Sequence, residues 1–204
     1  MARTIPYLVH FTRSENLTSI LQHGLRPRSD IDIGTICGAI NDQGRYDNRT
    51  DRNCLILGFP NYKMFFKLRQ SVENSEWPIL FLHPSILWRF DCLYCHTNAA
   101  ATCISCQPEE ELATLEAFAK LFEESPGSPT RAAESLRPCD PTDVQAEVLV
   151  KGIIPPEYIF AIAFRSHPDM NQHKPACGTR QTFLSDQRAF YGQREFALRN
   201  RYVV

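Results

Sequence analysis

The chain has 204 residues, 43% of them hydrophobic and 22% charged, and a formal net charge of −1. These values indicate a globular protein with a real core, and they exclude a disordered chain and a protein that attracts nucleic acid through its overall charge. No apolar run approaches the roughly 20 residues that span a bilayer, and residues 1–7 have no signal-peptide character. We therefore expect a cytoplasmic protein of one domain over residues 1–204, with reduced or metal-bound cysteines.

Taken in chain order, the first half of the sequence predicts short strands separated by short helices. Leu17, Ile20 and Leu21 recur at helical spacing, and the following Gly24 indicates where that helix ends. Residues 41–53 are almost entirely polar, and they form either a solvated face or an active-site loop. The predicted elements are a strand over 7–12, a helix over 16–23, a strand over 54–59, a helix over 62–69, a strand over 77–82 and a helical turn over 84–87.

The second half predicts one longer helix, over 109–123, which is acidic at its start and apolar along one face. Residues 92–106 before it form an irregular cysteine-bearing loop, and four prolines after it indicate a mobile linker over 125–143. The irregular order predicts an α+β fold, and neither a Gly-x-Gly-x-x-Gly turn nor a P-loop is present. The remaining segments are strands over 145–150 and 159–164, a polar stretch over 167–181 and a basic, aromatic tail over 188–204.

Three residues are candidates for chemistry. Glu147 lies in a strand of apolar and small residues, so it is either an outward-facing edge residue or a carboxylate that is paired or used in catalysis. His10 shares one face of the first strand with Thr12, and it is either a hydrogen-bonded structural residue or a catalyst. Arg45 stands beside Tyr46, a pairing that suits a pyrophosphate and an aromatic ring, although the same loop also fits a charged surface.

The cysteines form two pairs, Cys92-x-x-Cys95 and Cys103-x-x-Cys106. Paired thiolates at this spacing can place four sulfur atoms around a structural zinc ion. The seven residues between the pairs are fewer than in common zinc ribbons. Zinc ligands and reduced structural cysteines therefore both remain open interpretations.

Arranged along the chain, these features resemble the DarT family of DNA ADP-ribosyltransferases. The resemblance covers nearly all of the first 165 residues, and it is specific because the order and spacing of the motifs agree. The motifs are His-Phe-Thr at 10–12, Asn-Leu-Thr-Ser-Ile-Leu at 16–21 with Gly-Leu at 24–25, Asp-x-x-Arg-x-Asp at 42–47, Phe-Pro-Asn-Tyr-Lys-Met-Phe at 59–65, Pro-Ser-Ile-Leu-Trp at 84–88, Thr-Asn-Ala-Ala at 97–100 and Gln-Ala-Glu at 145–147.

The resemblance implies a PARP-like ADP-ribosyltransferase fold, an α+β domain of split mixed β-sheets with NAD+ in the cleft. It implies that Glu147 and Arg45 are catalytic and that single-stranded DNA is the acceptor, with thymidine as the default base. In thymidine-modifying members the segment between that arginine and the next strand is longer, which makes guanosine the second candidate. The residues implied for NAD+ binding are His10, Phe11, Thr12, Asn16, Gly24, Arg45, Tyr46, Tyr62 and Met64, and those implied for DNA binding are Arg49, Arg52, Lys63 and Lys67.

The chemistry that this resemblance implies suits these residue types. Breaking the nicotinamide–ribose bond creates an oxocarbenium-like centre, which a fixed carboxylate such as Glu147 stabilises in a water-poor cleft. Arg45 would neutralise the pyrophosphate, and the tail, if it is not simply an ordinary helix, suits a single nucleic-acid strand. The resemblance also implies a toxin that is held in check by an antitoxin ADP-ribosyl hydrolase of macrodomain or NADAR type.

Two alternatives stay open at this point. An ADP-ribosyltransferase that acts on RNA or protein would share the NAD+ cleft but not the basic substrate surface. A non-catalytic, zinc-stabilised module that binds nucleic acid would use the cysteines and the tail, and it would leave Glu147 and His10 without roles.

Overall fold

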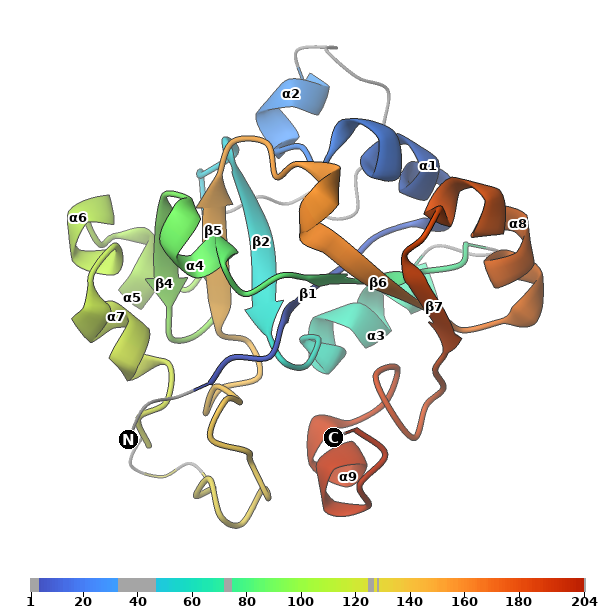
Figure 1. Ribbon diagram of the computed structural model, residues 1–204. Coiled ribbons are helices and arrows are strands. Elements are labelled where there is room, and N and C mark those ends of the chain that lie inside the picture. The colour runs from blue at the N-terminus through green and yellow to red at the C-terminus, as the bar shows by residue number, and fades with distance from the viewer. Residues whose placement is uncertain (1–3, 33–46, 72–74, 125–126, 128, 204) are drawn as a thin grey trace.

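The computed structural model describes residues 4–32, 47–71, 75–124, 127 and 129–203. Within these residues the chain forms one mixed sheet in the order β4-β5-β2-β1-β3-β6-β7, with helices on both faces (Figure 1). Neighbouring strands are antiparallel, except for the parallel pair β6 and β7. The strands are β1 Leu8–Phe11, β2 Arg52–Leu57, β3 Ile79–Leu82, β4 Cys92–Cys95, β5 Glu147–Lys151, β6 Ile159–Phe164 and β7 Gln181–Leu184.

The sheet is split where β2 changes partners. Arg52 to Leu55 pair with β5, whereas Ile56 and Leu57 pair with β1, so in these registers no residue of β2 has a strand partner on both sides. β4, β5 and β2 form one half, and β1, β3, β6 and β7 form the other. Figure 1 shows β2 and β5 running across the direction of β6 and β7. The two halves therefore diverge at the middle of β2, as the predicted split sheet requires.

Side-chain alternation along the strands builds an apolar cluster on each face of the sheet. Leu8 and Leu80 belong to one cluster, while Val9 and Ile79 belong to the other. The first cluster buries Leu17, Ile20 and Leu21 of α1, which confirms the apolar stripe that the sequence predicted for this helix. The second cluster buries Phe65 of α3 and Ala197 of α9.

The helices are short, and among the described residues none is long and apolar enough to cross a membrane. The longest is α8, which lies beside α1 and at the end of the sheet that carries β7 (Figure 1). The bounds are α1 Ser14–His23, α2 Arg28–Asp32, α3 Tyr62–Ser71, α4 Ile86–Arg89, α5 Thr102–Ser105, α6 Glu109–Leu112, α7 Leu115–Lys120, the 3₁₀ turn η1 Pro156–Tyr158, α8 His167–Cys177 and α9 Arg194–Arg199.

The single helix predicted over 109–123 is wrong, because the segment breaks into α6 and α7. Thr114 leaves the helical conformation, with φ −101° and ψ 161°, and its side-chain oxygen accepts a hydrogen bond from the Ala117 N–H. This is the geometry of an N-cap residue, so α7 starts anew at Leu115. The break also leaves Leu115, which the sequence placed on the apolar face, 81% exposed.

The segments predicted as a mobile linker and as a polar stretch are more regular than the sequence suggested. Residues 129–143 form hydrogen-bonded turns, in which Arg131 Nη1 donates to the Asp140 backbone oxygen at 2.8 Å. The polar stretch forms α8 and β7. The helix docks through polar contacts, because Ser14 of α1 hydrogen-bonds to both Asp169 and His173 of α8. The sequence of α8 has no apolar stripe to predict the helix, because its contacts with α1 are polar.

Gly24 provides a stability test of the fold. Its φ of 87° and ψ of 167° lie in a region that only glycine adopts readily, and an added Cβ would lie 2.6 Å from the Ile154 carbonyl oxygen. We expect Gly24→Ala to lower the free energy of unfolding by more than about 2 kcal/mol. Each kcal/mol lost should lower the melting temperature by roughly 2–4 °C. Gly152→Ala is the matched control, because its φ is 71° but no atom lies within 4 Å of the new Cβ. Equal losses in the two variants would contradict a role for the contact with Ile154.

Candidate active site

Glu147 opens β5, and its carboxylate is buried in the structure. The residue is 7% exposed, and its Oε2 accepts a hydrogen bond of 3.0 Å from the backbone N–H of Ala99. Ala99 lies in the turn after β4, where the Asn98 side chain in turn accepts a bond from the Ala100 N–H. A buried carboxylate needs such donors to offset its lost hydration. Of the two interpretations of Glu147, the outward-facing edge residue is therefore wrong.

His10 lies where β1 and β2 separate. The pairing of these strands stops at Val9 and Ile56, and one further step would place His10 opposite Leu55. Instead the His10 Nδ1 hydrogen-bonds to the Cys54 carbonyl oxygen at 2.9 Å, so the ring joins the two halves of the sheet beyond the end of the ladder. Cys54 pairs in turn with Leu149 of β5, two residues from Glu147. His10 of β1 and Glu147 of β5 therefore lie on the two strands that flank β2.

A second polar group lies at the junction of β1 and α1. Thr12 is buried, and its hydroxyl accepts a hydrogen bond of 3.2 Å from the Asn16 side-chain amide. The Thr12 backbone N–H donates to the carbonyl oxygen of Pro78, the residue before β3, and this bond fixes Thr12 beside the start of β3. The bond between Thr12 and Asn16 therefore fixes this junction, two residues beyond His10 in the chain. The adjacent Phe11 faces the other way and stacks on Phe65 at 4.5 Å between ring centroids.

The polar loop returns to the described structure close to Glu147. Asp47 and Arg49 are buried, and Arg49 Nη2 donates to the Gln107 carbonyl oxygen at 3.0 Å. Burial is the main cause that raises the pKa of the neighbouring Cys95 thiol to about 12. The negative charge of Glu147 also raises this pKa, whereas the positive charge of Arg49 lowers it. Glu147, Arg49 and Cys95 therefore lie near one another. Arg45 and Tyr46, the predicted pyrophosphate clamp, lie outside the described residues.

The two loop arginines predicted to contact DNA hold structural positions. Arg52 is 1% exposed, and its guanidinium bonds to the carboxylates of both Asp91, at 3.2 Å, and Glu109, at 2.7 Å. Arg49 also approaches Glu109, at 3.6 Å. Their guanidiniums are therefore directed at the segment that contains α5 and α6 rather than at an open surface. Gly24, predicted to touch NAD+, similarly ends α1 by donating its N–H to Ile20.

The start of α3 carries three of the predicted residues. The Tyr62 hydroxyl donates to Glu195 Oε1 at 3.1 Å, and burial together with this carboxylate raises the Tyr62 pKa to about 12. The Met64 N–H is capped by the Asn61 side-chain oxygen at 3.1 Å, which fixes the first turn of the helix. Lys63 is exposed on the same turn, and Lys67 follows it one turn later.

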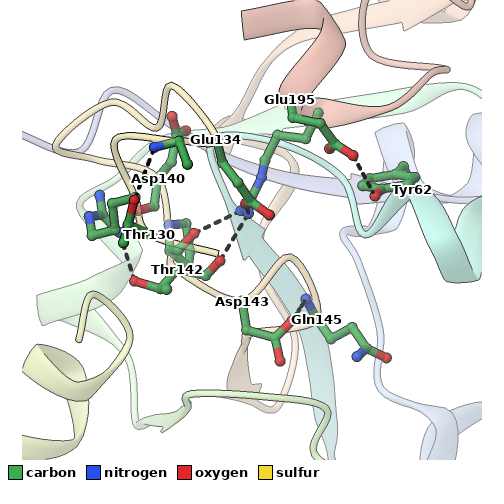
Figure 2. Close-up of polar contacts among 12 residues, drawn as sticks. Tyr62, Thr130, Glu134, Asp140, Thr142, Asp143, Gln145 and Glu195 are labelled. Carbon is green, nitrogen blue, oxygen red and sulfur yellow. Dashed lines mark hydrogen bonds and ion pairs between the residues drawn. The ribbon is translucent and has the colours of Figure 1, made fainter. Parts of the chain in front are cut away.

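A polar cavity of about 430 Å³ opens beside these residues. It lies between the start of α3, the turn after β4, the end of α7, the segment 129–145 and α9 (Figure 2). Gln145, two residues before Glu147 in the chain, is part of its wall, whereas Glu147 itself is not among the lining residues. Its lining residues are Tyr62, Lys63, His96, Thr97, Lys120, Leu121, Glu123, Pro129, Glu134, Thr142, Asp143, Val144, Gln145, Arg194 and Glu195.

Arg194 organises the far wall of the cavity, a role for which the sequence carries no signal. It is buried, and its guanidinium donates to the Pro141 carbonyl at 2.7 Å and to Glu134 at 3.1 Å. Figure 2 shows the neighbouring Glu195 directed at Tyr62, from which it accepts a hydrogen bond. Both of these partners of Arg194, Pro141 and Glu134, lie more than 50 residues before it in the sequence. Only the fold brings them together.

The tetrahedral zinc site predicted from the four cysteines does not form. Cys92 and Cys95 are three residues apart on β4, so their side chains enter different apolar clusters on opposite faces of the sheet. Cys103 and Cys106 are exposed at α5. Across the part of the chain that the structure describes, which includes all four cysteines, no group of three His, Cys, Asp or Glu side chains is arranged to hold a metal ion.

Solved structures with the same fold are DarT proteins. Thermosipho africanus DarTG in complex with ADP-ribose matches with a TM-score of 0.60 and 19% identity, over 91% of this chain and 51% of that one, so the present chain spans about half its length. Thermus sp. 2.9 DarT matches in its complex with NAD+, with a TM-score of 0.56, 14% identity and coverage of 92% and 98%. The same protein with ADP-ribosylated ssDNA matches with a TM-score of 0.57, 14% identity and coverage of 92% and 99%.

These matches define the class of fold as the PARP-like α+β fold of the DarT proteins, as the sequence predicted. No curated protein matches the sequence. The model of the family described as "ssDNA thymidine ADP-ribosyltransferase, DarT" matches residues 9–187. This match covers most of the chain, so the chain belongs to the DarT family of ADP-ribosyltransferases.

The positions of the cysteines predict which thiols react. Burial raises the pKa of Cys92 and of Cys95 to about 12, so both stay protonated at about pH 8 and react with a thiol reagent only after unfolding. The double variant Cys103→Ser/Cys106→Ser should have two fewer fast-reacting thiols than the parent protein. The double variant Cys92→Ser/Cys95→Ser should have the same number of fast-reacting thiols as the parent protein. Elemental analysis of both variants and of the parent protein should find no zinc in proportion to protein. Stoichiometric zinc that disappears in either variant would restore the metal hypothesis.

Proposed function

We propose that this chain transfers ADP-ribose from NAD+ to a base of single-stranded DNA, with thymidine as the acceptor. The observation that supports this most directly is the Glu147 carboxylate, which is buried at the start of β5 and held by the Ala99 N–H. The family description names the same activity. Thermus sp. 2.9 DarT, which has the same fold, has been solved with NAD+ and with ADP-ribosylated ssDNA.

The side chains of the cleft fit NAD+ by their chemistry. Sugar hydroxyls and a carboxamide require hydrogen-bond donors and acceptors in a partly dry site, and His10, Thr12 and Asn16 supply both at the junction of β1 and α1. Each is held by a bond to its neighbours, so the pocket needs little reorganisation when NAD+ binds. In our proposal these three residues hold one end of NAD+, Phe11 supports the strand behind them by packing on Phe65, and Arg45 and Tyr46 hold the pyrophosphate.

Glu147 carries the chemistry in this proposal. NAD+ supplies an ADP-ribosyl group whose ribose C1′ becomes positive as neutral nicotinamide leaves. The fixed carboxylate lies where that charge develops and stabilises it more than it stabilises the ground state. Its oxygens also orient the ribose 2′-hydroxyl, and it accepts the proton that the thymine ring nitrogen loses as that nitrogen bonds to C1′. One glycosidic bond breaks, one forms, and the proton lost by the base balances the reaction.

DNA would approach over the start of α3. Lys63 and Lys67 are exposed there, and Lys63 also lines the cavity, so the pair suits phosphates on either side of the modified base. Tyr62 and Met64 belong to the same first turn of α3. A base that reacts must be unstacked, which a single strand allows at low cost. Arg49 and Arg52, already bound to Gln107 and Glu109, are not part of this proposed surface.

We further propose that the chain acts as the toxin of a toxin–antitoxin pair. A base that carries ADP-ribose blocks templated pairing, so a cell that makes this enzyme needs a hydrolase that removes the group. We expect an antitoxin of macrodomain or NADAR type. The similarity to a chain named DarTG, which is about twice as long and was solved with ADP-ribose, supports a coupled partner of this kind.

Substitution of the carboxylate tests the mechanism. Glu147→Gln keeps the shape of the side chain and an oxygen that accepts from Ala99, but it removes the charge and the base. We expect ADP-ribosyl transfer to fall by about 100-fold or more, while NAD+ binding and melting temperature change little. Glu157→Gln, an exposed glutamate on the 3₁₀ turn, is the matched control. Unchanged transfer by Glu147→Gln would remove this residue from the mechanism.

Omission of single bases tests the acceptor. The protein is incubated with NAD+ and with short single-stranded DNAs that each lack one base, and the products are read by intact mass. We expect an added ADP-ribose on every strand that contains thymine and none on the strand without it. Loss only when guanine is absent would replace thymidine by guanosine. Adducts on RNA or on protein, with none on any DNA, would overturn the proposal in favour of another acceptor.

A further inference from the structure

The end of the chain forms an exposed aromatic surface beyond the part that the family model matches. That match stops at residue 187, whereas α9 and the four described residues after it cover 194–203. Phe196 is 46% exposed and Tyr202 47% exposed, and their ring centroids lie 6.0 Å apart. We name this pair of rings the tail platform. Two neighbouring rings at this exposure offer faces on which another planar group can stack.

The tail divides into a structural half and an open half. Tyr191, Arg194, Ala197 and Leu198 are buried, and the Tyr191 hydroxyl donates to the Trp77 carbonyl at 2.7 Å, so this half fixes the tail to the sheet. In the open half, Arg199, Asn200 and Arg201 are exposed together with the two rings. The guanidinium of Arg188 lies 5.6 Å from the centre of the Tyr202 ring. The platform is therefore rigidly mounted, and it has exposed arginines beside it at positions 199 and 201, whereas Arg188 is paired with Asp186 at 2.7 Å.

Residues next to the tail platform and close to Glu147 in the chain line the same cavity. Glu195, the residue before Phe196, lines the cavity and accepts a hydrogen bond from Tyr62 of α3. The opposite wall contains Gln145, two residues before Glu147. Figure 2 shows Glu195 and Gln145 on two sides of this polar region, with Tyr62 beside Glu195. Phe196 and Tyr202 are not among the residues that line the cavity, so a strand would have to extend past the cavity to contact both sites.

We propose that the tail platform binds a flanking segment of the DNA strand, by stacking bases on Phe196 and Tyr202 and pairing phosphates with Arg199 and Arg201. This inference rests on the proposed function and adds to it a second contact site, away from the modified base. Stacking on aromatic rings accepts any base, because every base has a π-face. The platform therefore adds affinity for a long single strand and adds no choice between bases.

The chemistry of the platform favours a single nucleic-acid strand over a protein partner. A protein interface has an apolar centre depleted of charge, whereas these rings have the exposed Arg199 and Arg201 beside them. A duplex keeps its bases stacked on one another and cannot use the rings. Alternating aromatic and cationic groups are the usual surface for single strands.

The test is DNA binding as a function of strand length. We compare a trinucleotide centred on the target base with two strands of about 12 nucleotides, one extended on the 5′ side of that base and the other on the 3′ side. This length of about 12 nucleotides is within the range of single-strand binding sites. The double variant Phe196→Ala/Tyr202→Ala should raise Kd and KM for one long strand by about tenfold or more and leave the trinucleotide and kcat unchanged. Arg199→Gln/Arg201→Gln should make the salt dependence shallower, by about 0.7 in log–log slope for each phosphate that the variant no longer neutralises.

Two controls separate this role from a structural one. Phe160→Ala on β6 removes a ring of similar exposure, 41%, that is not part of the tail, and it should not change DNA binding. The double variant Phe196→Trp/Tyr202→Phe keeps an aromatic ring at both positions and should bind the long strand tightly. If the alanine variant lost binding only because it misfolds, this conservative variant would not be expected to differ from it in this way.

The outcomes also separate the two proposals. If the parent protein modifies DNA but the alanine double variant binds the long strand as tightly as the parent does, the platform is not a DNA site and the proposed function stands. If the parent protein neither binds nor modifies any single strand, the proposed function fails and the platform proposal fails with it.

Discussion

The hydrogen bond between His10 and the Cys54 carbonyl is the contact on which the site depends, because it spans the place where the sheet comes apart. A continuous sheet would fill the space beside β1 with backbone pairs and leave no cleft. A sheet that simply ended there would leave polar backbone groups without partners. The imidazole satisfies the Cys54 carbonyl while the strands diverge. The ring of His10 thus bridges β1 and β2 at the place where their backbone pairing ends.

A second constraint supports Glu147 from behind. Its carboxylate is bonded to the turn after β4, and α5 and α6 follow that turn directly. Arg49 and Arg52 hold this segment by their bonds to the Gln107 carbonyl and the Glu109 carboxylate. The arginines of the polar loop therefore act on the carboxylate indirectly, through the backbone that binds it. Their burial gives the turn a rigidity that short helices would not provide alone.

The sequence predicted the elements best where burial is apolar and periodic. The strand over 159–164 has the predicted bounds in β6, and the apolar stripe of α1 is correct. Prediction failed where polar groups decide the structure. Thr114 divides a helix by capping its second half, and α8 docks through Ser14, Asp169 and His173.

The same reasoning explains which parts of the site could be foreseen. Glu147 and His10 were identified because each is a polar residue in an otherwise apolar strand and each belongs to an ordered motif. The zinc hypothesis failed because cysteine spacing does not reveal that β4 sends Cys92 and Cys95 to opposite faces. The cavity wall around Arg194 and Glu134 has no local pattern at all, since its members are contributed by distant turns.

The strand order has a consequence for how the protein is made. β5 lies between β4 and β2, so β4 has no strand partner until residues 147–151 have been synthesised. The Glu147 carboxylate and its Ala99 donor are 48 residues apart, and they meet only when this late strand inserts between two earlier ones. A ribosome-bound chain that stops before β5 therefore has neither the carboxylate nor the turn geometry that holds it. The contact between Glu147 and Ala99 therefore forms only after β1, β2 and β4 have been translated.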